Sequence, residues 1–293
     1  MKRLVVNADD FGLTESTNRG ILETHRQGIL NSTSLLANGA AFDSAVALAL
    51  GSPPLGVGVH LNLTDGCPVS NPSTVSTLVN EGGRFFGGPV GLARRILARR
   101  VRPAEVEREL GAQIEKVLGA GTAITHLDGH KHVHMLPGIF PIVVRLARRY
   151  GIAGLRAAIE RPTNLGAFLR RHPGAARRAV TQYLRGRALA LLAMDCREQL
   201  RQAGVACPMY FYGITQTGLL DGAELDAILW NLPEGTSELM CHPGYADGAL
   251  RQTGTRLLAE REREREALTR PETWNLIAAL GIQLVNYRRL SPT

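Results

Sequence analysis

The 293-residue chain has few cysteines and few aromatic residues, and it contains no long apolar run. Its cysteines, Cys67, Cys196, Cys207 and Cys241, are scattered and form no CxxC pair. This spacing argues against a disulfide framework or a zinc ribbon and fits a reducing compartment. The longest apolar runs fall short of the roughly 20 residues that span a bilayer, and the run after Arg3 is too short for a signal peptide. We therefore expect a soluble, cytoplasmic protein without a transmembrane segment.

Acidic residues are missing from residues 161–190, and this stretch holds seven arginines. The whole chain carries a formal net charge of +8. Nucleic acid is not an expected partner, because aromatic residues are sparse and no binding motif accompanies the charge. A solvated helical insertion at about residues 160–208 is the simplest interpretation. Leucines among the arginines also fit peripheral contact with an anionic membrane. Three roles stay open for this insertion: a lid, a lipid-headgroup contact and a contact within a homo-oligomer.

Short apolar runs alternate with longer helical patterns along most of the chain, which is typical of α/β architecture. The expected strands are residues 4–6, 32–36, 55–63, 123–127, 155–159, 237–241 and 282–287. The expected helices are residues 14–28, 41–50, 103–119, 137–150, 255–269 and 271–280. A Pro/Ser/Gly-rich loop over residues 65–88 is long for a compact domain, so we expect it to be functional. Nothing in the composition requires a second domain, and we expect a single domain over residues 1–293.

Polar residues suited to catalysis follow several of the expected strands. Asp9 and Asp10 follow the first, His60 lies in the third, and His242 follows a strand near the end of the chain. Each of these residues alone has a simpler structural explanation as a cap, a turn or a packed side chain. Because the carboxyl ends of parallel strands share one face, their common placement predicts a shared site. In an extended chain, Asp9 and Asp10 would point to opposite sides, so one could bind a metal while the other accepts a proton.

Residues 125–134, Thr-His-Leu-Asp-Gly-His-Lys-His-Val-His, hold four histidines and Asp128. Neutral imidazole is a common metal ligand and is costly to bury without a partner, so this density predicts metal binding. An extended segment would place all four histidines on one face, whereas a helical turn would pair His126 with His130. Spacing alone does not choose the ligand. The other histidines and Asp128 are expected to hold the ligand rings in place.

Four motifs stand at these positions: Asn-Ala-Asp-Asp-Phe-Gly at 7–12, Gly-Val-His at 58–60, Thr-His-Leu-Asp-Gly-His at 125–130 with His-Met-Leu-Pro at 134–137, and Met-Cys-His-Pro at 240–243. Together they resemble the motifs of the YdjC/ChbG-like carbohydrate deacetylases. The resemblance covers residues 1–159 and resumes near Tyr210. It implies a deformed (β/α) TIM-like barrel that removes the N-acetyl group from an N-acetylglucosamine-type sugar. The substrate would be an oligosaccharide or, in a hopanoid-biosynthesis HpnK-like branch, a lipid-linked sugar.

Carried over position by position, the resemblance implies roles for six residues. It makes Asp10, His60 and His130 the metal ligands, Asp9 the general base, His242 the general acid, and Arg156 a residue that orients Asp9. The resemblance implies one magnesium ion, whereas two histidines and a carboxylate suit zinc or another late transition ion. Two departures leave the substrate open: Gly129 stands where a serine is common, and the basic insertion is longer than in the chitobiose enzymes.

Two alternatives to deacetylation stay open at this point. A metal-dependent sugar isomerase or lyase on the same barrel could use the same ligands and would leave the acetyl group in place. The second alternative is a carbohydrate-binding protein that has lost catalysis. Loss of Asp9 or His242, the expected proton-transfer groups, would favour it, but both are present.

Overall fold

The computed structural model describes residues 1–161, 163–193 and 195–291. These residues form an eight-stranded sheet in the order β5-β4-β3-β2-β1-β7-β6, and β8 pairs with β1. All of these strand pairs are parallel. The strands are β1 (Lys2–Phe11), β2 (Ser32–Leu35), β3 (Gly56–Leu61), β4 (Ile124–Gly129), β5 (Gly154–Leu155), β6 (Tyr210–Tyr212), β7 (Gly235–Cys241) and β8 (Gln283–Leu284).

The two edge strands of this sheet are joined by backbone contacts that nearly close it. Leu155 in β5 donates its amide to the carbonyl of Ala206, and Arg161, beyond β5, donates its amide to the carbonyl of Phe211 in β6. Isolated parallel bridges join Gly154 to Ala206 and Glu160 to Phe211. The expected deformed TIM-like barrel is therefore confirmed, with short strands and isolated bridges where a regular barrel has a continuous ladder.

β1 is the central strand, and eight of its ten residues are buried. It pairs with β7 from Lys2 to Ala8, with β8 at its beginning and with β2 from Asn7 onward. Burial on both faces explains why its sequence reads as an apolar run instead of an alternating pattern. The strand is longer than the run that predicts it, because buried polar residues continue it as far as Phe11.

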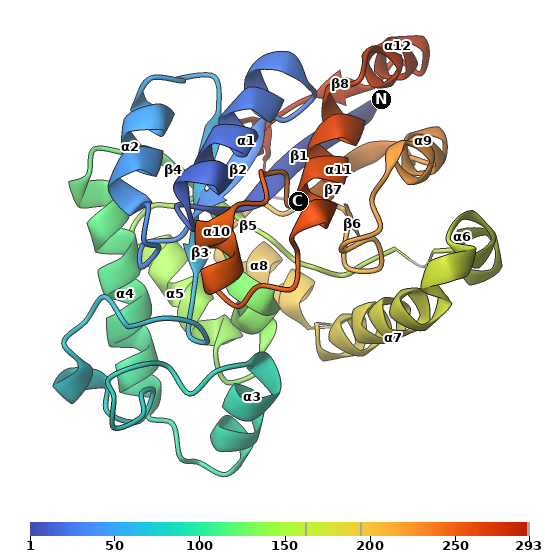
Figure 1. Ribbon diagram of the computed structural model, residues 1–293. Helices are drawn as coiled ribbons and strands as arrows, with labels where there is room; N and C mark the ends of the chain where they lie inside the picture. Colours follow the sequence, from blue (N-terminus) through green and yellow to red (C-terminus); the bar gives the residue numbers. More distant parts are fainter. Residues whose placement is uncertain (162, 194, 292–293) are drawn as a thin grey trace.

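Helices surround the sheet (Figure 1). They are α1 (Glu15–Gln27), α2 (Phe42–Leu50), α3 (Pro89–Leu97), α4 (Pro103–Gly119), α5 (Phe140–Arg149), α6 (Leu165–Arg171), α7 (Ala176–Leu192), α8 (Cys196–Ala203), α9 (Gly222–Trp230), α10 (Gly248–Gln252), α11 (Ala259–Thr269) and α12 (Pro271–Ala279). As predicted, α4 begins at a proline and buries Val106, Leu110 and Ile114. Thr14 caps α1 by accepting the amide of Thr17. Such caps fix where a helix begins.

The basic stretch forms α6 and α7, followed by α8, between β5 and β6. In Figure 1, α6 and α7 lie to one side of the strands. The long loop after β3 contains a short 3-10 helix, Pro72–Val75, and leads into α3. The apolar pattern did not predict α9, and α11 begins four residues later than expected. Within the described residues, the helices are too short or too polar to cross a bilayer.

Candidate active site and metal centre

All six residues to which the resemblance assigns a role lie at or just beyond the carboxyl ends of strands. They are Asp9 and Asp10 in β1, His60 in β3, His130 after β4, Arg156 after β5 and His242 after β7. Since these strands run parallel, their carboxyl ends face the same side of the barrel. The structure brings all six residues together there.

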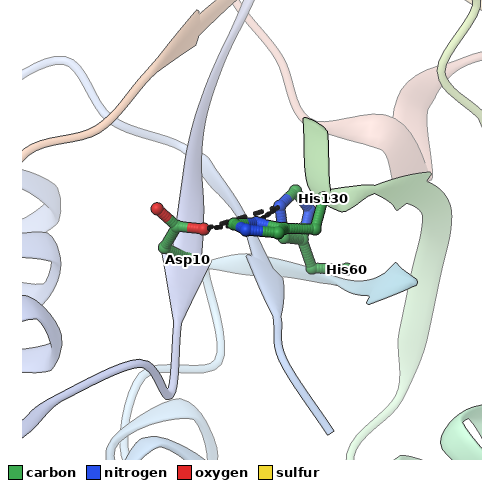
Figure 2. Close-up of side chains that lie close together, drawn as sticks. All are labelled: Asp10, His60 and His130. Atoms are coloured by element: carbon green, nitrogen blue, oxygen red, sulfur yellow. Dashed lines mark hydrogen bonds and ion pairs between the residues drawn. The ribbon is translucent and has the colours of Figure 1, made fainter. Parts of the chain in front are cut away.

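Three side chains point toward a common centre, as Figure 2 shows. Asp10 Oδ1 lies 3.0 Å from His130 Nδ1 and 3.7 Å from His60 Nε2. The two imidazole nitrogens are 3.4 Å apart. Two ligands that each lie about 2.1 Å from one ion are themselves roughly 3 to 3.5 Å apart. Asp10, His60 and His130 therefore form a group that could hold one metal ion.

The backbone at Asp10 explains how neighbouring carboxylates reach the same centre. Asp10 has φ 69°, in the left-handed region, and the pairing of β1 with β2 shifts register between Ala8 and Phe11. This irregularity breaks the alternation of an extended strand. Asp9 Oδ2 then lies 4.0 Å and Asp10 Oδ1 3.7 Å from the same atom, His60 Nε2. The expectation that the two side chains point to opposite sides is therefore wrong. Strained backbone of this kind is typical of functional sites.

Of the four clustered histidines, only His130 belongs to this group. The chain leaves the extended conformation after Gly129, because Lys131 and His132 have φ 54° and 57°. His126 stacks on Tyr287, and burial lowers its pKa to about 3. His134 donates from Nε2 to the carbonyl of Arg156. The other histidines are thus neutral packing and bridging groups.

Gly129, where the resemblance led us to expect a serine, lies against one of these histidines. A Cβ atom added at Gly129 would be 2.7 Å from His134 Nδ1. The His134 ring is fully buried, so it has little room to move. A side chain at position 129 is therefore incompatible with the present position of His134.

Two carboxylates hold the candidate ligand rings from behind. His60 donates from Nδ1 to Asp128 Oδ1 at 2.8 Å, which leaves Nε2 free to face the centre. On the other ring, His130 Nε2 lies 3.2 Å from Asp65 Oδ2. Burial lowers the pKa of His130, but the carboxylates of Asp10 and Asp65 outweigh it and raise that pKa to about 9. Partners of this kind fix the tautomer and orientation of ligand imidazoles.

Arg156 is fully buried and contacts three carboxylates at once. Its guanidinium donates to both oxygens of Asp9, at 2.8 and 3.0 Å. It also lies 2.8 Å from Asp128 and 2.9 Å from Glu238. Burial raises the pKa of Asp9, but Arg156 and His60 outweigh this effect and lower it overall. Asp9 is therefore ionised and fixed in orientation, which is the arrangement expected of a base that Arg156 positions.

The other side of the centre is lined by α11. Arg261 donates to Asp10 Oδ2 at 2.6 Å, and Glu264 accepts the backbone amide of His242. Glu264 also lies 3.9 Å from the Nδ1 atom of His242. Burial lowers the pKa of His242 to about 4, although Asp9 and Asp10 oppose this shift. The side chain of His242 is thus neutral at neutral pH in the free protein.

A second group, Asp9, His60 and Asp128, also has metal-ligand spacing. It is the weaker candidate, because both oxygens of Asp9 and both of Asp128 already accept from Arg156, Ser34 or His60, whereas Arg261 takes only the Oδ2 atom of Asp10. The buried Oδ1 atom of Asp10 is different: among the described residues, no hydrogen bond of good geometry reaches it. Its ion-pair partner is the His130 ring, 3.0 Å away, and a cation bound between the two would take the place of a ring proton. The group of Asp10, His60 and His130 therefore fits a cation well.

The residues that the sequence reasoning missed are Asp65, Glu238, Arg261 and Glu264. Asp65 begins the loop that we expected to be functional, so its position in the sequence already suggested a role in the site. Arg261 and Glu264 belong to a helix in which charged residues predominate, and their charge alone does not distinguish them. Their spacing of three residues places them on the face that carries Leu268, and both are buried.

The chain is similar to known proteins over nearly its whole length. The model of the YdjC-like protein family matches residues 3–279. A carbohydrate deacetylase of Brevibacillus brevis is 35% identical over 288 residues, which cover 98% of this chain and 99% of the relative. A carbohydrate deacetylase of Geobacillus stearothermophilus is 34% identical and covers 97% of this chain and 96% of its own length.

A solved structure from Enterococcus faecalis V583, described as a candidate cellobiose-phosphate cleavage protein, is also similar. It matches with a TM-score of 0.76 and 28% identity, over 98% of this chain and 97% of its own. The similarity in sequence and in fold thus extends over nearly the whole chain. Together with the family match, it shows that the chain belongs to the YdjC-like family, as its motifs predicted.

Proposed function

We propose that this chain is a metal-dependent carbohydrate deacetylase that removes the N-acetyl group from an N-acetylglucosamine-type sugar and releases acetate. The observation that carries the proposal is the convergence of Asp10, His60 and His130 beside Asp9, which Arg156 holds by two hydrogen bonds. Full-length relatives named carbohydrate deacetylase support the reaction class.

The proposed metal ligands are Asp10 Oδ1, His60 Nε2 and His130 Nδ1. A divalent cation bound there would polarise the acetyl carbonyl and lower the pKa of a water molecule. Two imidazoles and one carboxylate favour zinc or another late transition ion, whereas magnesium, which the family resemblance implies, prefers oxygen ligands. Metal analysis of the purified protein, followed by reconstitution with each ion, decides between them.

The proposed proton transfers use residues on either side of the centre. Asp9 Oδ2 takes a proton from water, whose oxygen adds to the acetyl carbon and forms a tetrahedral oxyanion. Arg156 keeps Asp9 in place during this step. His242 is neutral at rest, and the developing negative charge raises its pKa. His242 thereby takes up a proton from solvent and gives it to the sugar nitrogen, the C–N bond breaks, and acetic acid and the free amine leave. Asp9 then returns to solvent the proton that it took from water, and acetic acid ionises to acetate.

The proposed substrate is either a soluble oligosaccharide or a lipid-linked sugar. The Enterococcus faecalis neighbour is described as acting on a disaccharide phosphate. The exposed faces of Leu184 and Leu191 on α7, beside Arg187, favour a lipid-linked sugar and peripheral membrane contact instead. Acetate release from matched soluble and lipid-linked substrates separates the two possibilities.

Substitutions at the centre test the proposal. We expect Asp10→Ala and His130→Ala to lose both bound metal and acetate release. We expect Asp9→Asn to keep the metal and lose at least about a hundredfold in kcat, because general-base catalysis contributes about that much. Asp43→Asn, a change of the same chemistry on α2, serves as control. Full acetate release by metal-free Asp10→Ala protein would contradict the proposal. Substrate that is converted with its acetyl group retained would indicate an isomerase or a lyase instead.

Three further expectations stay predictions. We propose that residues 1–293 are one deacetylase domain with a basic helical insertion at about 160–208. The four cysteines are all free, and three are buried, which suits the cytoplasmic location we expect. A homo-oligomer is tested by sedimentation of the purified protein.

A further inference from the structure

An open cavity of about 660 Å³ lies between α7, the segment before α9, and α11. Four arginines line it, Arg177, Arg178, Arg256 and Arg263, and the acidic residue among its lining residues is Glu260. None of the six residues of the candidate active site contributes to its wall. The cavity is therefore separate from the centre described above.

The positive charge in this cavity is only partly neutralised. Glu260 lies 2.9 Å from Arg178 and 3.6 Å from Arg263, so it is shared between two arginines. Within the described part of the chain, no carboxylate lies within ion-pair distance of Arg177 or Arg256. Four guanidinium groups facing one carboxylate leave a surplus that a bound anion would neutralise.

The electrostatic environment of Arg256 supports this picture. Burial lowers its pKa, and the neighbouring positive charges of Arg185 and Arg178 lower it further. Positive charges therefore lie close to Arg256, and one of them, Arg178, lines the same cavity. An anion in the cavity would relieve that repulsion.

The amino end of α7 adds to the positive field of the cavity. Thr181 and Gln182 also line it, but the Thr181 hydroxyl donates to the carbonyl of Arg177, so the arginines are the main donors. Gly174 and Ala175 line it just before α7, and the N-cap residue Ala175 has no side chain that could cap the helix. The amino end of a helix carries a partial positive charge, which adds to the field of the arginines.

We propose that this cavity binds a phosphate group. Guanidinium groups donate two parallel hydrogen bonds to phosphate oxygens, and a phosphate dianion balances the surplus of arginines better than a singly charged carboxylate does. The phosphate belongs either to a soluble molecule or to a lipid headgroup, and the chemistry of the cavity is the same for both. The site does not depend on the proposed deacetylase activity, because its residues are distinct and its test measures binding.

The test compares two double variants of the full-length protein. Arg177→Gln/Arg256→Gln removes the two arginines that have no carboxylate partner. Arg26→Gln/Arg148→Gln removes the same charge from exposed positions of α1 and α5 outside the cavity. Calorimetry measures binding of inorganic phosphate and pyrophosphate at constant ionic strength, with chloride as the reference anion. Co-sedimentation measures binding to phosphatidylcholine vesicles with and without phosphatidic acid.

We expect affinity to fall at least about tenfold in the cavity variant and to stay unchanged in the control, since each charge-assisted contact contributes about a factor of ten or more. Binding of the free anions indicates a soluble ligand. Binding only of vesicles with phosphatidic acid, with the same dependence on the variants, indicates a lipid headgroup. Absence of binding in both assays, or an equal loss in the two variants, overturns the proposal. Arg256→Lys provides a second, milder test, because lysine keeps the charge but not the paired hydrogen bonds.

Discussion

At the scale of single residues, the candidate centre depends on pairs in which one side chain fixes another. Asp128 fixes His60, Asp65 fixes His130, and Arg156 fixes Asp9. The partners differ in exposure, because the side chain of Asp128 is fully buried and that of Asp65 is 46% exposed. Water can replace a lost contact at an exposed position but not at a buried one.

This difference leads to a prediction for two matched variants. We expect Asp128→Asn to weaken metal binding about 10- to 100-fold, the usual cost of removing a group that orients a metal ligand. Asp65→Asn should cost less, because solvent reaches His130. Metal affinity measured by competition with a chelator gives both values. Equal losses, or a larger loss for Asp65→Asn, would show that burial of the partner does not control the site.

At the scale of secondary-structure elements, α1 and α11 hold the segments that carry the site residues. Gly20 in α1 faces Gly244, two residues after His242, and a Cβ added at Gly20 would lie 2.5 Å from the Cα of Gly244. On the other side, α11 supplies Arg261 to Asp10 and Glu264 to the amide of His242. The position of His242 is therefore set by helix packing.

We expect Gly20→Ala to destabilise the protein by about 1 to 3 kcal/mol, because the methyl group meets backbone atoms that cannot rotate away. It should also lower kcat by displacing the segment after His242. Gly91→Ala in α3 is the matched control: a Cβ there meets no atom within 4 Å of it in the described structure. Its higher helix propensity should stabilise the protein by up to about 1 kcal/mol. Urea unfolding measures both, and a neutral Gly20→Ala would refute the close packing.

At the scale of the whole molecule, closure of the barrel between β5 and β6 involves one buried carboxylate. Glu160 accepts hydrogen bonds from the amides of Gly213 and Thr215 and from the hydroxyl of Thr215. Gly186 of α7 packs against it, since a Cβ added there would lie 2.3 Å from Glu160 Oε2. Burial raises the pKa of Glu160 to about 7 even though these donors lower it.

The raised pKa of Glu160 predicts how its contribution to the stability of the protein changes with pH. Between the ordinary value of 4.5 and about 7, Glu160 is ionised in the unfolded chain and still protonated in the folded one. The unfolded state binds fewer protons there, so stability falls as pH rises through this window. Glu160→Gln cannot titrate, so we expect its free energy of unfolding to fall less, or rise more, with pH across this window than that of the wild type. Denaturant unfolding at several pH values measures the two slopes, and identical slopes would contradict the assignment.

Much of the architecture follows from the sequence alone. Alternating apolar runs and helical patterns predict parallel strands with helices between them, because burial on both faces of a strand requires such runs. The same placement predicts that Asp10, His60 and His242 share one face. The irregular closure at Ala206 and Phe211 could not be predicted, because it depends on single backbone contacts between segments about 50 residues apart.

What the tertiary structure decided lies in the details of the centre. The spacing of the four histidines does not show which of them binds the metal. In the structure the chain turns after Gly129, and only the ring of His130 joins the candidate metal group. Asp9 and Asp10 reach one centre only because the backbone of Asp10 is left-handed. Arg261 is 251 residues from Asp10 in the chain, and no local pattern predicts such a contact. The sequence determines which chemical groups stand at strand ends, whereas long-range packing determines which of them meet.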